Sequence, residues 1–192
     1  KKDIRDLALI RDIHKFNQLL EILASQSGQL LNVAELSNTC GLAKQTIEHY
    51  LFLLEATYIL KRIVPYSKNL RSELFKTPKV FFYDTGLMQM FWFKGLQKEI
   101  LGSVFETSVF SELVKKYGVE NISFWRTTDK KEIDFILRQK ETVLPIEVKL
   151  QLAQFQPTAI HYFSKKYSIK KYKVVYLKGE PKHDCDIVPW QL

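Results

Sequence analysis

Two segments in the second half of the chain, Glu132–Ile136 and Pro145–Leu150, alternate apolar and charged residues as half-buried β-strands do. Successive side chains of a strand point to opposite faces, so Glu147 and Lys149 share one face and their apolar neighbours share the other. The same alternation places Asp134 on the polar face of the first strand and the apolar residues opposite it. A hairpin that joins the two strands would therefore bring Asp134, Glu147 and Lys149 together.

A helix is predicted upstream of these strands, over residues 101–117, and it carries one acid among apolar residues. Glu106 lies on the same helical stripe as Val109, Phe110 and Leu113. A buried carboxylate is costly unless it is paired or bound to a metal, so we expect Glu106 to have a partner. The alternative is that its side chain reaches solvent or meets a lysine.

Glu106, Asp134 and Glu147 would together form an oxygen-rich site of the kind that binds Mg²⁺ or Mn²⁺. We predict Asp134, Glu147 and Lys149 as catalytic residues of phosphodiester cleavage, because a metal bound there would polarise a phosphoryl group and activate a water molecule. Lys149 would stabilise the developing negative charge or help to deprotonate that water. The alternative is structural, since an acid and a lysine two residues apart on a strand often form an ordinary surface pair.

The charge of the chain favours a polyanionic partner such as DNA, because the formal net charge is +8 and the pI is near 9.3. Lysines are frequent in the C-terminal part, at Lys165, Lys166, Lys170, Lys171, Lys173, Lys178 and Lys182. A solvated surface and a nucleic-acid face both explain such a cluster. Nearer the predicted site, Arg126, Lys130 and Lys131 could hold a nucleic-acid backbone.

The first half of the chain predicts a winged helix-turn-helix. Apolar residues recur at helical spacing in residues 12–24, 33–40 and 43–56. Strands are expected at residues 58–64 and 79–83. The connection between these strands has the position of a wing and is basic, with Lys68, Arg71 and Lys76.

The third helix of this unit offers two residues for contact with DNA. Lys44 and Gln45 stand near its start, where base-reading helices present polar donors. Glu48 and Glu55 on the same helix would repel the phosphates of DNA, so a structural or protein-docking role is the alternative. We interpret His49 as a surface residue of this helix.

The boundary between two domains is expected near Lys94, which gives a winged helix-turn-helix domain at 1–94 and a second domain at 95–192. Residues 87–93 are apolar nearly all round, and we expect this segment to be buried where the domains meet. The second domain predicts the order helix, three strands, helix and strands, which suits a mixed sheet flanked by helices. The predicted fold class is therefore α+β.

The sequence indicates a cytoplasmic protein with no membrane association. No run approaches the roughly 18 consecutive apolar residues of a membrane span, and the charged start lacks the apolar core of a secretory signal. The two cysteines, Cys40 and Cys185, have no metal-ligand spacing, which argues against a disulfide framework or a zinc site. The chain starts with Lys1 and not with Met, so we expect a fragment of a longer protein.

The pattern of Glu106, Asp134 and Glu147-x-Lys149 resembles the signature of the PD-(D/E)XK restriction-endonuclease-like superfamily, within the second domain only. The chain departs from that signature in one respect, because Glu132 and not proline occupies the region before Asp134. Glu132 is therefore a competing ligand. The chain also has no clear Gln-x-x-x-Tyr element after Lys149, which separates it from recombination exonucleases.

A wider arrangement is similar to a domain of unknown function that follows the ATPase module in prokaryotic AAA-type ATP-binding proteins. The residues that carry the resemblance are Ala24–Gly28, Thr46–Leu60, Lys79–Leu87 and Phe105–Glu106. The resemblance implies a winged helix joined to a restriction-endonuclease-like fold, with an upstream AAA-type ATPase domain of the same polypeptide as partner. ATP should not bind this fragment, because it has no Gly-x-x-x-x-Gly-Lys-Ser/Thr stretch.

These observations leave three hypotheses. The first is a nuclease-like region that cleaves or grips DNA with a divalent metal under control of the ATPase. The second is a non-catalytic DNA- or protein-binding module that regulates the ATPase. The third is a structural appendage that sets the oligomeric state, and the sequence is compatible with a homo-oligomer.

Overall fold

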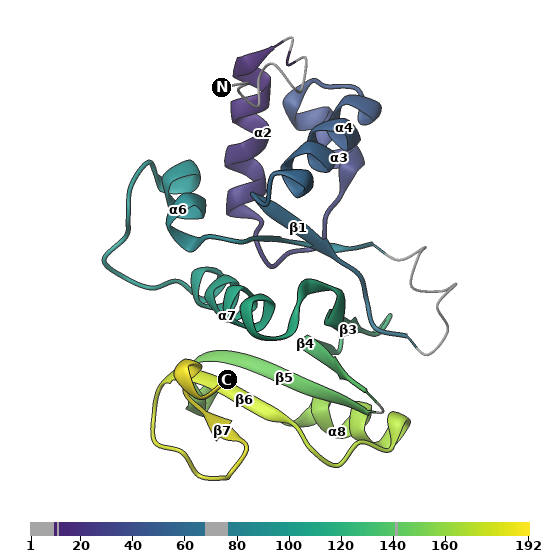
Figure 1. Cartoon of the computed structure of the whole chain (residues 1–192), viewed down its shortest axis with the longest axis vertical. Helices are drawn as coiled ribbons and strands as arrows, with labels where there is room; N and C mark the ends of the chain where they lie inside the picture. Colours follow the sequence, from purple (N-terminus) through teal and green to yellow (C-terminus); the bar gives the residue numbers. More distant parts are fainter. Residues whose placement is uncertain (1–9, 11, 68–76, 141) are drawn as a thin grey trace.

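The computed structural model describes residues 10, 12–67, 77–140 and 142–192. Six α-helices, a two-stranded sheet and a mixed five-stranded sheet occur within these residues. Figure 1 shows the N-terminal helices on one side of the small sheet and the five-stranded sheet at the other end of the molecule, with helix α7 between the two. The α+β class is the one that the sequence predicts.

The first part of the chain forms three helices close to the predicted bounds: α2 is Ile13–Ser25, α3 is Val33–Cys40 and α4 is Lys44–Ala56. Asp12 begins α2 by accepting a hydrogen bond from the backbone N–H of Lys15 at 3.1 Å. Gly41 ends α3 in the left-handed conformation, with φ of 57°, which glycine adopts without steric cost. The apolar faces of the three helices share one buried cluster.

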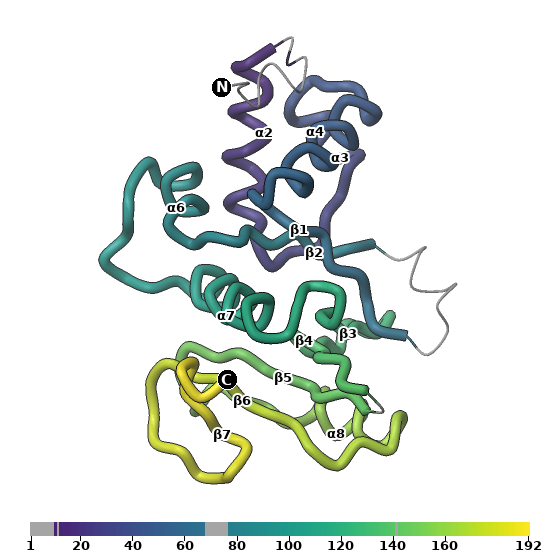
Figure 2. Tube along the Cα trace, viewed as in Figure 1, coloured from purple at the N-terminus to yellow at the C-terminus, as the bar shows by residue number. Residues whose placement is uncertain are grey.

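The small sheet pairs β1 (Leu60–Ile63) with β2 (Lys79–Phe82) in antiparallel register. All four residues of β2 are buried, because this strand lies between two cores. Phe82 packs with the N-terminal helices, whereas Phe81 packs with α7 (Gly102–Tyr117) and the large sheet. Figure 2 shows β2 crossing between these two parts of the molecule.

Two predictions about the region around β2 have different outcomes. The basic connection with Lys68, Arg71 and Lys76 lies outside the described residues. Residues 87–93 of helix α6 (Thr85–Phe93) are predicted to be buried where the domains meet, and this holds only in part. Met88 is fully buried, whereas Met90 is 51% exposed, because the contacts of α6 with α2, α7 and β2 leave part of the helix surface uncovered.

The large sheet has the strand order β3-β4-β5-β6-β7. Its strands are β3 (Ile122–Arg126), β4 (Glu132–Gln139), β5 (Thr142–Gln151), β6 (Lys173–Lys178) and β7 (Asp186–Ile187). The first two pairings are antiparallel and the last two are parallel, so the sheet is mixed, as predicted. The expected hairpin is β4–β5, in which Phe135 lies opposite Ile146.

Each face of the large sheet packs on a helix. Ile146 and Val148 of β5 lie in the cluster that includes α7, and α8 (Thr158–Tyr167) covers the other face. Ile133 departs from simple alternation, because it packs in the α8 cluster and not with Phe135. The register between β3 and β4 shifts at this point, and such a bulge redirects side chains to the opposite face.

The two halves of the chain are in direct contact. A parallel bridge joins Pro65 to Phe124 at the edge of the large sheet. The buried hydroxyls of Ser27 and Thr107 are hydrogen-bonded at 2.8 Å. The surfaces of the two halves that meet here are therefore shielded from solvent.

Two further expectations concern the cysteines and membrane-spanning helices. Cys40 and Cys185 are both free thiols. Among the described residues, no helix combines the length and the apolar character needed to cross a membrane.

Candidate functional site

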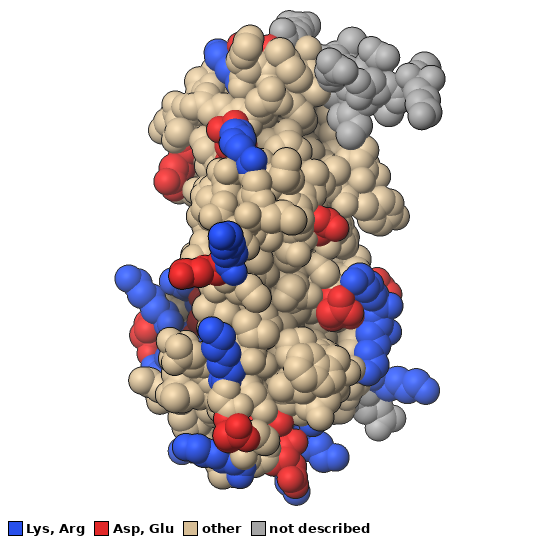
Figure 3. All heavy atoms as spheres, turned by 90° about the vertical axis from the view of Figure 1, so that its left-hand side faces the viewer, with Lys and Arg blue, Asp and Glu red and all other residues tan. Residues whose placement is uncertain are grey.

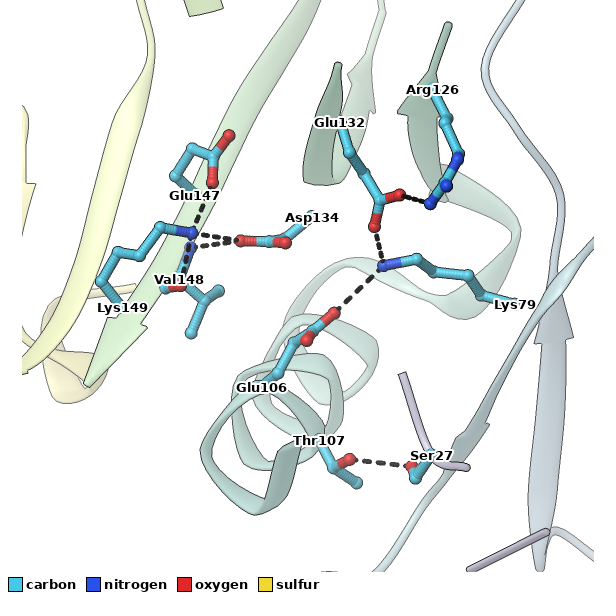
Figure 4. A network of polar contacts seen from close by, with 10 residues as sticks. All are labelled: Ser27, Lys79, Glu106, Thr107, Arg126, Glu132, Asp134, Glu147, Val148 and Lys149. Carbon is cyan, nitrogen blue, oxygen red and sulfur yellow. Dashed lines mark hydrogen bonds and ion pairs between the residues drawn. The ribbon is translucent and has the colours of Figure 1, made fainter. Parts of the chain in front are cut away.

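The hairpin β4–β5 brings the predicted catalytic residues together. Lys149 Nζ lies 2.9 Å from Glu147 Oε2 and 3.4 Å from Asp134 Oδ2. The backbone ladder of the hairpin ends at Phe135, and the Asp134 carboxylate then accepts the backbone N–H of Val148 at 2.8 Å. Figure 4 shows Asp134 between the strand that carries Glu147 and the helix that carries Glu106. Asp134 therefore lies just beyond the last backbone pair of the hairpin, where its carboxylate accepts a hydrogen bond from the neighbouring strand.

The electrostatics of this group follow from its burial. The side chain of Glu147 is 6% exposed, and burial together with the charge of Asp134 raises its pKa to about 8, against the opposing effect of Lys149. Burial disfavours the charge of Lys149, but Asp134 and Glu147 outweigh that effect and raise the pKa of the ammonium group. Lys149 is therefore protonated at neutral pH.

Glu106 follows the alternative given in the sequence analysis, because its side chain meets a lysine. Its Oε1 lies 3.4 Å from Lys79 Nζ, and its side chain is 17% exposed. Its Oε2 faces Gly28, where an added Cβ would approach that oxygen to 3.2 Å. Burial and the charge of Asp134 raise the pKa of Glu106 to about 8, although Lys79 opposes the shift.

Lys79 is the site residue that our sequence reasoning missed. Its side chain is 4% exposed, and Nζ also lies 2.5 Å from Glu132 Oε1 and 5.5 Å from the centre of the Phe124 ring. Glu132, the competing ligand of the sequence analysis, is paired on its other oxygen with Arg126. A signal for Lys79 was available, because an ionisable residue that opens the apolar strand Lys79–Phe82 requires a buried partner.

Acidic charge exceeds basic charge by one in this network, when all groups are ionised. Its members are Glu106, Glu132, Asp134, Glu147, Lys79, Arg126 and Lys149. A partly buried group of carboxylates with one surplus negative charge suits a proton or a divalent cation, and oxygen donors are those that Mg²⁺ and Mn²⁺ prefer. Within the described ranges, no three Asp, Glu, His or Cys side chains are placed to hold a metal ion. Glu106 faces Lys79 instead.

The predicted nucleic-acid-binding residues fall into two separate groups. Arg126, Lys130 and Lys131 lie at the turn between β3 and β4, where Lys131 pairs with Asp129, and Lys130 is exposed. Lys44 and Gln45 are exposed at the start of α4, in the other half of the molecule.

The surface charges are mixed on the face of the molecule that carries α6. Figure 3 shows few charged side chains in the upper part of this face, and both signs at its lower end. The C-terminal lysines Lys165, Lys166, Lys170, Lys171, Lys178 and Lys182 are exposed on and after α8.

Comparison with known protein families divides the chain in two. The profile of a domain of unknown function, DUF8612, matches residues 1–99, which is more than half of the chain. The chain belongs to this family. A second domain of unknown function, DUF4143, matches residues 101–192. The DUF8612 domain therefore contributes Lys79 to the network, and the DUF4143 domain contributes the remaining members.

Similar proteins are themselves uncharacterized. A protein of Haemophilus influenzae is 29% identical over 93% of this chain and 44% of its own length. Proteins of Mycobacterium bovis and Mycobacterium tuberculosis are each 23% identical over 78% of this chain and 35% of their own lengths. The chain thus spans less than half the length of these curated relatives. No solved structure matches it significantly.

Proposed function

We propose that this chain is the nuclease-like, nucleic-acid-binding region of an AAA-type ATP-binding protein, and that it cleaves DNA phosphodiester bonds with Mg²⁺ or Mn²⁺. The observation that carries the proposal is the convergence of Asp134 and Glu147 on one ammonium group, Lys149, across two neighbouring strands. The net charge of +8 supports a polyanionic substrate. The greater length of the relatives leaves room for an ATPase domain in proteins of this kind.

In this mechanism Asp134 and Glu147 would hold the divalent ion, and Glu106 would be the third carboxylate. The bound ion would polarise the scissile phosphoryl group and lower the pKa of a water molecule. Lys149 would stabilise the negative charge that develops on the phosphoryl oxygens, because Asp134 and Glu147 raise its pKa in the metal-free protein and favour the ammonium form. Arg126, Lys130 and Lys131 would hold the DNA backbone.

A cleavage assay tests the proposal. The wild-type chain, Asp134→Asn, Lys149→Ala and Lys115→Ala would be incubated with single- and double-stranded DNA in Mg²⁺ or Mn²⁺. Lys115 is the matched control, because it is an exposed lysine on α7 that pairs with Glu112 outside the site. We expect the first two variants to lose about 100-fold or more in rate and the control to keep it. Equal activity in all four proteins, or no cleavage by any, would reject the assignment.

A second candidate function is a non-catalytic module that binds DNA or protein and regulates the ATPase. The observation in its favour is that Lys149 has three acceptors, Asp134, Glu147 and the carbonyl of Val148, for its three protons. A fully satisfied ammonium group is also what a structural ion pair requires. DNA affinity with a steep salt dependence, without any Mn²⁺ uptake in calorimetry, would support this function.

A further inference from the structure

We propose that Lys79 and a divalent cation compete for the Glu106 carboxylate, so that strand β2 of the DUF8612 domain controls how many carboxylates the site in the DUF4143 domain offers to a metal. This inference rests on the proposed metal-dependent function. It assigns Lys79 as a positioning residue that acts through Glu106.

Both oxygens of Glu106 face the DUF8612 domain. Oε1 is paired with Lys79, and Oε2 lies beside Gly28, where a Cβ would approach it to 3.2 Å. Gly28 is itself tied to β2, because its N–H donates to the carbonyl of Val80 at 2.7 Å, and its φ of 87° favours glycine. Lys79 and Gly28 therefore belong to one hydrogen-bonded unit, and this unit holds the Glu106 carboxylate as a whole.

The charges explain why a metal and Lys79 would exclude each other at Glu106. Lys79 is buried, and its single ammonium group is shared by two acids, Glu106 and Glu132. A divalent ion on Glu106 would place a second cation beside the buried ammonium group, and like charges at such separations repel strongly where water is excluded. Without Lys79, the partly buried Glu106 carboxylate would lose its cationic partner and would favour a bound cation.

With Lys79 present, the carboxylates other than Glu106 that could meet a metal are Asp134 and Glu147, which share the ammonium group of Lys149. Removal of the Lys79 ammonium group by substitution would make Glu106 available as a third ligand. The identity of one side chain on the buried strand β2 would thus determine how many carboxylates the site offers.

Calorimetric titration of the 192-residue chain with Mn²⁺ tests this inference. We would compare the wild type with Lys79→Met, Lys79→Gln and Lys61→Met. The glutamine variant keeps an amide donor for Glu132 and guards against misfolding of the methionine variant. Lys61 on β1 is the matched control, because it carries the same charge in the same small sheet and pairs with Glu55 away from the site.

We expect both Lys79 variants to bind Mn²⁺ about tenfold more tightly or better, and Lys61→Met to bind as the wild type does. Mn²⁺ should also raise the melting temperature of the Lys79 variants more than that of the wild type, a difference that a purely structural lysine would not produce. The gain in affinity should disappear when Glu106→Gln is added to Lys79→Met.

Three results would overturn the inference, and they bear differently on the proposed function. If Asp134→Asn abolishes Mn²⁺ binding while the Lys79 variants bind as the wild type does, the metal site stands and the competition does not. If the wild type and every variant fail to bind Mn²⁺, both are rejected. A gain that persists in the Lys79→Met, Glu106→Gln double variant would also overturn it, because Glu106 would then not be the ligand in question.

Discussion

Truncation of Phe81 tests whether the two family domains unfold as one body. Phe81 lies on β2 in the DUF8612 domain, but its fully buried ring packs in the core of the DUF4143 domain. It stacks on Phe110 with 4.8 Å between ring centroids and contacts Phe135 at 5.3 Å. Phe81→Ala would therefore leave a cavity in the second core through a change made in the first domain.

The expected loss is about 3–5 kcal/mol of unfolding free energy, as for other fully buried aromatic residues. For a chain of this size each kcal/mol lowers the melting temperature by about 2–4 °C, so the transition should fall by about 6–20 °C. Differential scanning calorimetry would measure this shift and the number of transitions. The control is Phe52→Ala, because Phe52 is 61% exposed and its truncation should change stability by less than about 0.5 kcal/mol.

One cooperative transition that moves as a whole would support a single folding unit. The reasoning would be refuted if the two variants had the same melting temperature. Two separate transitions, of which Phe81→Ala moves only one, would show that the domains unfold independently despite their contact.

Other perturbations probe individual ion pairs and the surface charge. Because burial and Asp134 raise the pKa of Glu106 from 4.5 to about 8, its carboxyl ionises first in the unfolded state. The metal-free protein should therefore lose about 1–4 kcal/mol of unfolding free energy as pH rises from about 5 to 8, and urea titrations should show a flatter slope for Glu106→Gln. Arg62 donates its Nη2 to Glu55 Oε2 at 2.8 Å and its Nη1 to Glu48 Oε2 at 2.7 Å, so Arg62→Met, which removes both bonds, should cost about 1–3 kcal/mol in chemical denaturation. An unchanged denaturation midpoint would contradict the role of this pair. If α4 contacts DNA, Lys44→Gln should reduce the slope of log affinity against log salt by about 1 in fluorescence anisotropy, and an unaltered slope would exclude that contact.

Local signals predicted most elements of the fold. The apolar periodicity predicted α2, α3, α4 and α7 to within one or two residues of their observed ends. The alternation of β5 also predicted that Glu147 and Lys149 share a face, and the hairpin brought Asp134 to them. Such features depend on residues close in sequence, and local sterics and hydrogen bonds decide them.

The errors lie where distant contacts outweigh a local pattern. The apolar run of α6 predicted burial all round, but Met90 is half exposed, because α2, α7 and β2 together do not cover the whole helix. The alternation of β4 failed at Ile133, because the register with β3 shifts there. The periodicity of α6 does not specify how much of its surface its neighbours cover. The alternation of β4 likewise does not specify where a bulge occurs.

The sequence by itself determined the secondary structure, the α+β class and the proximity of Asp134, Glu147 and Lys149. Only the tertiary structure decided the surroundings of Glu106, which depend on Lys79, 27 positions away and in the other domain. The physical reason is that charge neutralisation in a buried site depends on which groups the packing of two cores brings within a few ångströms. Strand and helix periods specify which face a residue occupies, but they do not specify which distant residue it meets.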